Sequence, residues 1–420
     1  MTNATHHPRP VVQYLCALLI AIPLVCLIAA RTNSTPPKYE AIQYVDMARN
    51  GIIGNPNLVS PMAYRPGTPL ASRVVADVLS VSIENGFRIV GWISSIAFLM
   101  CVFTLARCFT VDYRHALVTM VILGLSFTHL KFPLFFYTLV DGPADPLMVI
   151  AFWALITKRF YLCLLISSIG VLFKEFLAIP LFLVILHFGW GFWRSRSRRD
   201  LVHLVVALGI GLGVIGIPRL CIPVSRQGEF VNPLDLRTLG TFLFATLDEK
   251  RLFDVMYAAA SYWLPTVLLL TPSRFNKLWA DLRGRHLWVM SIYLSLVLLL
   301  TVYGGNNTFI YIGYSVAAQA VVLALLFRSG VGFAEGTYVV VVMMLYNKTM
   351  LHIPLPDHGF DAYIDFYGGW SPRVSLPIVV RFIEMGAFVI LAMCGRSVAA
   401  KIASDGRRDA PAACAVTPGR

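Results

Sequence analysis

The sequence predicts an all-α protein, a bundle of membrane-spanning helices, and three observations carry that prediction. The 420 residues are 57% hydrophobic and 14% charged, a balance that excludes an ordinary soluble globular chain. Apolar runs close to the ~20 residues that cross a bilayer recur from end to end. Basic residues gather in alternate connections between these runs, which is the pattern of cytoplasmic loops.

About twelve spans are predicted, within a range of ten to thirteen. Their ranges are 11–30, 88–106, 114–131, 143–157, 160–173, 176–193, 201–221, 254–271, 287–303, 309–327, 336–350 and 375–395. The first run is as long as a full span, and no small-residue cleavage site follows it cleanly. We therefore expect a retained helix rather than a removed signal peptide, and a single transmembrane domain over residues 1–395.

The distribution of the excess basic residues indicates how the chain is oriented in the membrane. The net charge is +13, and the inner loops carry most of the basic residues if both termini are cytoplasmic. The strongest cluster is Arg194, Arg196, Arg198 and Arg199, which the positive-inside rule places in the cytoplasm. Nucleic acid is therefore not an expected partner. The tail 396–420, rich in Ala, Gly and Arg, is expected to be cytoplasmic and disordered.

The sequence lacks the motifs of several common kinds of site. The eight cysteines lie mostly within or at the ends of spans with no CxxC pair, so neither a disulfide framework nor a zinc site is predicted. No glycine-rich phosphate loop, HExxH helix or GxSxG elbow occurs. Nucleotide hydrolysis and a covalent serine mechanism are not indicated.

One long outer loop, 31–87, follows the first span in a chain whose other connections are mostly short. Two interfacial helices are expected in it, over 39–50 and 70–82, each with apolar residues at helical spacing. In the first helix these residues are Ala41, Tyr44, Val45 and Ala48. In the second they are Val74, Val75, Val78 and Leu79.

The first of these helices carries two carboxylates, Glu40 and Asp46. Six residues separate them, which turns them about 120° apart on a helix, so they cannot form one paired site. One could act in catalysis while the other is solvated or pairs with Arg49.

Four stretches together resemble the GT-C superfamily of polytopic membrane glycosyltransferases. They are Tyr39-Glu40-Ala41-Ile42-Gln43-Tyr44-Val45-Asp46-Met47-Ala48, Ala63-Tyr64-Arg65-Pro66-Gly67-Thr68-Pro69-Leu70, Thr138-Leu139-Val140-Asp141-Gly142-Pro143-Ala144-Asp145-Pro146-Leu147 and Gly170-Val171-Leu172-Phe173-Lys174-Glu175. They are similar to the family's acidic first loop, the Tyr-Arg-x-x-Pro-Leu that closes it, an outer Thr-Asp turn and a later Lys/Arg-Glu turn. The resemblance covers about the first 190 residues. Many members have Asp where this chain has Glu40.

The resemblance implies transfer of a sugar, with inversion, from a polyprenyl-phosphate carrier to a glycan, glycolipid or protein acceptor. The acid of the first outer loop would act at the outer face of a bacterial inner membrane. Such a reaction needs a base for the acceptor hydroxyl and cationic or amide groups for the departing phosphate. Glu40 is the first candidate for the base and Asp46 the second.

The remaining candidates are substrate contacts. Arg65 and Lys174 are the expected phosphate partners, although Lys174 could instead pair with Glu175 or snorkel. Asp141 and Asp145 could position the acceptor or bind a divalent cation, or could serve only as helix caps. No metal site is assigned, and no cofactor is predicted with certainty. The full set of candidate contacts is Tyr44, Arg65, Asp141, Asp145, Lys174, Glu175, Asn306, Asn307, His358 and Asp361.

The last four of these come from two distal outer segments. Asn306 and Asn307 offer amides, and Phe309 and Ile310 follow where the family often has an arginine. Asp357, Asp361 and Asp365 are four residues apart, so a helix would stack them on one face beside His358. Such a face would suit sugar hydroxyls or a divalent metal, whereas the glycines around it favour an irregular loop.

Two other classes share these features. A secondary transporter also has about twelve spans, but its charges and broken helices usually lie at mid-membrane and its halves often repeat. A flippase or polymerase of lipid-linked oligosaccharides would share the substrate class. Sugar transfer by the Glu40 and Asp46 variants, set against transport in proteoliposomes, separates these classes.

Overall fold

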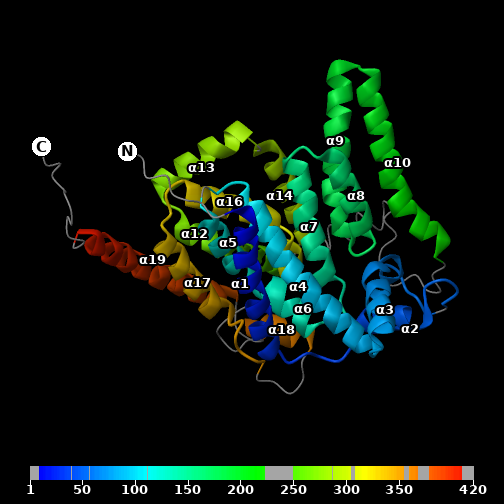
Figure 1. The fold of residues 1–420 in the computed structure, drawn as a ribbon, viewed down its shortest axis with the longest axis horizontal. Coiled ribbons are helices and arrows are strands. Elements are labelled where there is room, and N and C mark those ends of the chain that lie inside the picture. The colour runs from blue at the N-terminus through cyan, green and yellow to red at the C-terminus, as the bar shows by residue number, and fades with distance from the viewer. Residues whose placement is uncertain are drawn as a thin grey trace, which may run out of the picture.

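A computed structural model describes residues 9–222 except 39, 56 and 111, and then residues 249–285, 287–303, 308–353, 359–367 and 378–408. The regular elements in this part of the chain are all helices, with no extended strand, which confirms the predicted all-α class. Figure 1 shows the helices gathered into one bundle, from which one long hairpin projects.

The helices follow the predicted runs closely. Their bounds are α1 Pro10–Ala30, α2 Glu40–Asn50, η1 Met62–Tyr64, α3 Gly67–Leu79, α4 Ile83–Arg107, α5 Tyr113–Gly124, η2 Phe127–Lys131, α6 Phe132–Phe135, α7 Asp141–Ile156, α8 Phe160–Val171, η3 Glu175–Leu177, α9 Ala178–Ser195, α10 Arg198–Cys221, α12 Glu249–Leu269, α13 Pro272–Arg285, α14 Leu287–Tyr303, α15 Thr308–Gly313, α16 Val316–Arg328, α17 Phe333–Asn347, α18 Phe360–Tyr367 and α19 Ile378–Arg408.

Within the described residues, five helical segments are long and apolar enough to cross a membrane, and two bent pairs raise that number to seven. The five are Pro10–Ala30, Ile83–Arg107, Glu175–Ser195, Arg198–Cys221 and Leu252–Leu269. Shorter apolar helices, Phe160–Val171, Val316–Arg328 and Phe333–Asn347, coincide with three more predicted runs. The described residues therefore confirm a polytopic membrane protein, while the span count of about twelve and the cytoplasmic termini stay predictions.

Two predicted spans are interrupted rather than continuous. The run 114–131 divides at Leu125 and Ser126 into α5 and the η2–α6 segment, with a bend of 63°. The run 309–327 divides at Tyr314 and Ser315 into α15 and α16. The two breaks lie near one another, since Phe127 of η2 and Phe309 of α15 have ring centroids 5.4 Å apart.

Both predicted helices of the first loop exist, but their apolar faces differ in surroundings. The expected face of α2 is buried inside the protein with Met47, Leu58 and Phe87, not on the membrane surface. The expected face of α3 is largely exposed, with Val74, Val78 and Leu79 outward, so this helix does offer an apolar side to a membrane surface.

A close approach of α3 to α4 fixes the far end of the loop. A Cβ on Gly86 would lie 2.3 Å from the carbonyl oxygen of Ser72, so only glycine permits this packing. Ser82 caps α4 by accepting a hydrogen bond from the backbone of Asn85 at 3.2 Å. The loop is therefore held as one packed unit with the start of α4.

Two features at the periphery extend beyond the predicted spans. α9 and α10 form the hairpin that projects from the bundle in Figure 1, and the basic cluster 194–199 lies at its tip. α19 runs from Ile378 to Arg408, so residues 396–408, expected to be disordered, are helical. Residues 409–420 lie outside the described part.

Candidate functional site

The first helix of the outer loop places Glu40 and Tyr44 on one face, one turn apart. Tyr44 is fully buried, whereas the Glu40 side chain is 42% exposed. The apolar face of α2 packs inward, and this orientation carries the Tyr44 hydroxyl toward the segment that closes the loop.

The segment that closes the loop contains Arg65. The side chain is 11% exposed and donates from Nε to Glu175 Oε1 at 2.8 Å and from Nη1 to the Tyr44 hydroxyl at 3.0 Å. Its Nη1 also lies 4.0 Å from Glu40 Oε2. One guanidinium therefore joins α2 to the turn that follows α8.

The backbone explains why Arg65 reaches that turn. The Gly67 amide donates to the Leu172 carbonyl at 2.8 Å. A Cβ on Gly67 would lie 2.7 Å from the ring of Phe173, so a larger residue here would require that ring to move. Arg65 and Glu175 are thereby brought together from distant parts of the sequence.

Burial and neighbouring charges keep Arg65 and Tyr44 each in a single protonation state. Burial is the largest single effect and lowers the pKa of Arg65, but the charges of Glu175, Tyr44 and Glu40 and the hydrogen bond to Glu175 together outweigh it, so the net pKa is raised. Burial raises the pKa of Tyr44 well above its usual value, against the opposing charge of Arg65. Arg65 therefore stays cationic and Tyr44 stays neutral at physiological pH.

A second ion pair lies beside the first. Lys174 Nζ is 2.9 Å from Asp141 Oδ1, and both side chains are 8% exposed. Tyr314 donates to the same Asp141 oxygen at 2.7 Å. The alternative pairing of Lys174 with its neighbour Glu175 is not the one observed, because Glu175 pairs with Arg65.

A pocket of about 190 Å³ joins these elements. Glu40, Asp141 and Lys174 all line it, together with Thr35, Lys38, Thr138 and several apolar residues. The structure thus brings the first-loop acid, the start of α7 and the turn after α8 to one cavity, and Arg65, which does not line the cavity, lies 4.0 Å from Glu40.

Behind this pocket lies a chain of buried polar groups. Asp145 accepts from His129 Nδ1 at 2.8 Å, and His129 Nε2 contacts the Tyr262 hydroxyl. Tyr262 also donates to the Gly313 carbonyl at 3.2 Å. Asp145 therefore supports the site from one helical turn beneath Asp141, and does not line the pocket itself.

Asp46 lies apart from the pocket. Its two oxygens accept from the side-chain amides of Asn50 and Asn55, each at 2.7 Å. Arg49, its expected partner, instead pairs with Glu84 at the start of α4. The geometry gives Asp46 the role of fastening the end of α2 to the loop that follows.

The structure describes only some of the candidate residues from the distal outer segments. Asn306, Asn307 and His358 lie outside the described residues, as does the side chain of Asp361 on α18. Asp365 pairs with Arg381 at 3.3 Å. Among the described residues no group of three His, Cys, Asp or Glu side chains could hold a metal ion.

Three residues of the site were missed in the sequence. Tyr314 bonds to Asp141, Phe176 stacks on Tyr314 with centroids 4.6 Å apart, and His129 bonds to Asp145. A histidine inside an apolar run is a signal of function that could have identified His129. Tyr314 gave no such signal, because its break in the helix is invisible to hydropathy.

Comparison with known proteins gives one structural likeness. Neither a family model nor a curated protein matches the sequence. The fold aligns with the crystal structure of ArnT from Cupriavidus metallidurans bound to undecaprenyl phosphate, with a TM-score of 0.48 and 13% sequence identity. The alignment covers 93% of this chain and 77% of that one.

Proposed function

We propose that the protein is an integral membrane glycosyltransferase of the GT-C kind. It would move a sugar from a polyprenyl-phosphate carrier to an acceptor at the outer face of the membrane. The observation that carries the proposal is the shared pocket of Glu40, Asp141 and Lys174, with Arg65 4.0 Å from Glu40. A single transfer site requires these four residues to lie near one another.

Glu40 is suited to act as the base. It lines the pocket, it is the most exposed carboxylate of the cluster, and its nearest described cation stands off at 4.0 Å. It would take the proton of the acceptor hydroxyl while that oxygen forms a bond to the anomeric carbon. The bond from this carbon to the phosphate oxygen breaks, and its electron pair leaves with the carrier phosphate.

Arg65 and Lys174 are suited to receive that phosphate. Each is held in place by a carboxylate, Glu175 and Asp141 respectively, and each keeps N–H groups beyond those used in its ion pair. Cations fixed before the reaction stabilise developing negative charge without reorganising. Tyr44 fixes the position of the Arg65 guanidinium through its hydroxyl.

Glu40→Gln tests the proposal, with Asp46→Asn as the matched control on the same helix. We expect Glu40→Gln to lower sugar transfer by about 10²–10⁴-fold, the usual contribution of a general base. Asp46→Asn should retain transfer, because Asp46 is bonded to two amides away from the pocket. The measurement is transfer of labelled sugar from a polyprenyl-phosphate donor in membranes that contain equal amounts of each protein.

The same two variants, together with a transport assay, distinguish this proposal from the alternative functions. Full transfer by Glu40→Gln would remove the assigned base, and loss only in Asp46→Asn would move the role to Asp46. Movement of a lipid-linked sugar across proteoliposomes without transfer would instead indicate a transporter or flippase. The basic tip 194–199 predicts that the pocket lies on the outer side.

A further inference from the structure

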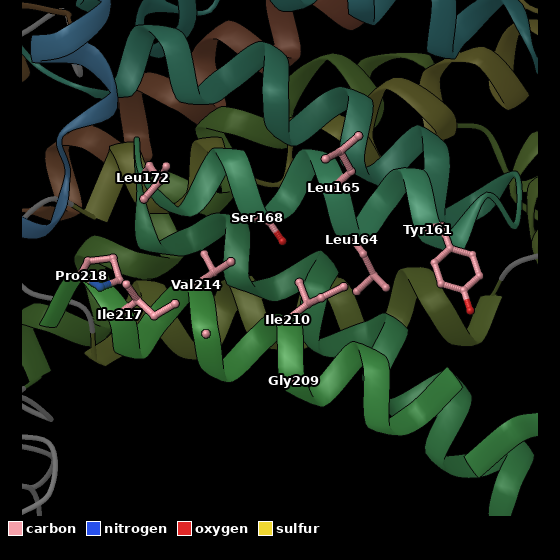
Figure 2. Close-up of a pocket in the computed structure, with 11 residues that line it drawn as sticks. Tyr161, Leu164, Leu165, Ser168, Leu172, Gly209, Ile210, Val214, Ile217 and Pro218 are labelled. Carbon is pink, nitrogen blue, oxygen red and sulfur yellow. The ribbon is translucent and has the colours of Figure 1, made fainter. Parts of the chain in front are cut away.

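A long apolar groove lies between α8 and α10, away from the pocket just described. Its volume is about 530 Å³, and its walls include Leu164 and Leu165 of α8 and Ile210, Val214 and Ile217 of α10. Figure 2 shows these side chains in a row, with Tyr161 at one end and Leu172 and Pro218 at the other. Among its described lining residues, only Tyr161 and Ser168 bring hydroxyls to it.

At its Tyr161 end the groove meets a second, polar cavity of about 710 Å³. Lys158, Arg159, Arg199 and His203 line this cavity, and among the described residues that line it Asp200 is the one carboxylate. Tyr161 lines both cavities and contacts His203 through its hydroxyl. The two cavities are therefore adjacent at Tyr161, and together they make a space that is apolar along the groove and basic at one end.

The basic groups of this cavity have little of their charge neutralised. Within the described residues neither Lys158, Arg159 nor Arg199 forms an ion pair, and the Asp200 carboxylate accepts a hydrogen bond from Ser195. Arg159 rests on the ring of Trp153 at 4.8 Å, which positions its guanidinium without neutralising it. Such a site attracts a group with negative charge.

The space lies at the opposite end of two helices from the candidate active site. Asp141 begins α7 and Lys174 follows α8, whereas Lys158 and Arg159 lie between the two helices. The 12 residues of α8 rise about 18 Å, which is more than half of a ~30 Å hydrocarbon core. A chain in the groove would thus occupy one leaflet, with its charged end at the basic face.

We propose that this space binds an anionic phospholipid of the leaflet next to the basic tip of the α9–α10 hairpin. One acyl chain would lie along the groove, and the headgroup phosphate would lie among Lys158, Arg159 and Arg199. Basic cavities between helices on the cytoplasmic side are a recognised mode of anionic lipid binding. The site depends on the membrane location of the chain and not on its proposed chemistry.

Lipid retention by the full chain in detergent, read by native mass spectrometry, tests the proposal. The probes are dioleoyl phosphatidylglycerol, dioleoyl phosphatidylcholine with the same chains, and inorganic phosphate. We expect phosphatidylglycerol to bind in preference to phosphatidylcholine, and phosphate to compete weakly because it lacks the chains. Equal binding of the two lipids, or displacement of phosphatidylglycerol by millimolar phosphate, would overturn the proposal.

Two matched pairs of variants locate the site. Arg199→Gln should weaken phosphatidylglycerol about fivefold, from ~1 kcal/mol per basic residue, and leave phosphatidylcholine unchanged. Arg198→Gln, exposed and outside the cavity, is its control. Gly209→Leu fills the groove, because a Cβ there meets open space, and should weaken both lipids. Gly216→Leu, equally open but outside the lining, is its control.

Each pair can contradict the proposal. Equal lipid binding by Arg199→Gln and Arg198→Gln would remove the headgroup site, and equal binding by Gly209→Leu and Gly216→Leu would remove the acyl groove. Displacement of phosphatidylglycerol by undecaprenyl phosphate, with loss of sugar transfer in Gly209→Leu alone, would assign the groove to the transfer substrate instead.

Discussion

Replacing Lys174 with methionine should destabilise the protein, because the buried Asp141 carboxylate would lose its cationic partner. Lys174 Nζ lies 2.9 Å from Asp141 Oδ1, and both side chains are 8% exposed. Methionine keeps an apolar stem but removes the charge, so Asp141 is left with the hydrogen bond from Tyr314. Removing one partner of a buried ion pair costs about 3–5 kcal/mol, and we expect the free energy of unfolding to fall by that amount.

The assay is reversible unfolding in mixed micelles, followed by tryptophan fluorescence. Arg73→Met is the control, because its 3.8 Å pair with Asp77 is exposed and should contribute about 0.3–0.5 kcal/mol. The double variant Asp141→Asn with Lys174→Met should recover most of the stability, since it removes the unpaired charge. Its sugar transfer should stay low if Lys174 contacts phosphate. A loss for Lys174→Met no larger than that for Arg73→Met would refute the reasoning.

Two further predictions concern the first loop. Gly86→Ala should cost about 1–3 kcal/mol in chemical unfolding, because the new Cβ would meet the Ser72 carbonyl at 2.3 Å, whereas Gly216→Ala should cost nothing. Tyr44→Phe removes the hydrogen bond from Arg65 and should cost about 1.5–3 kcal/mol at pH 7. Burial raises the pKa of Tyr44, so stability from its neutral phenol is complete below pH ~10 and is lost as pH rises. Unfolding between pH 8 and 11 should therefore show the wild type losing its advantage over Tyr44→Phe above pH ~10, and a constant advantage would contradict this.

The sequence predicted the helices well because their causes are local. Apolar length fixes a span, and helical spacing predicted α2 and which of its faces is apolar. The prediction erred on what that face meets, because periodicity reports that one side is apolar and not whether protein or lipid covers it. α2 met Phe87 of α4, while α3 left Val78 outward.

The partners of the charged residues could not be predicted in the same way. Lys174 and Glu175 are adjacent, yet they pair with Asp141 and Arg65 from two other elements. Adjacent residues in an extended turn point in different directions, so each needs a partner on its own side. The choice between those partners depends on tertiary packing, here on the approach of Gly67 to Phe173.

The two helix breaks also depend on tertiary contacts that the local sequence does not reveal. Unwound backbone inside a membrane is tolerated only where other groups of the protein satisfy it. At the second break the Gly313 carbonyl accepts from Tyr262 and the Tyr314 carbonyl accepts from Tyr293 at 2.5 Å. Both donors come from other helices, so hydropathy along residues 309–327 cannot reveal the break. Yet the break is what turns the Tyr314 hydroxyl onto Asp141, and the site therefore depends on tyrosines of α12 and α14 that do not line its pocket.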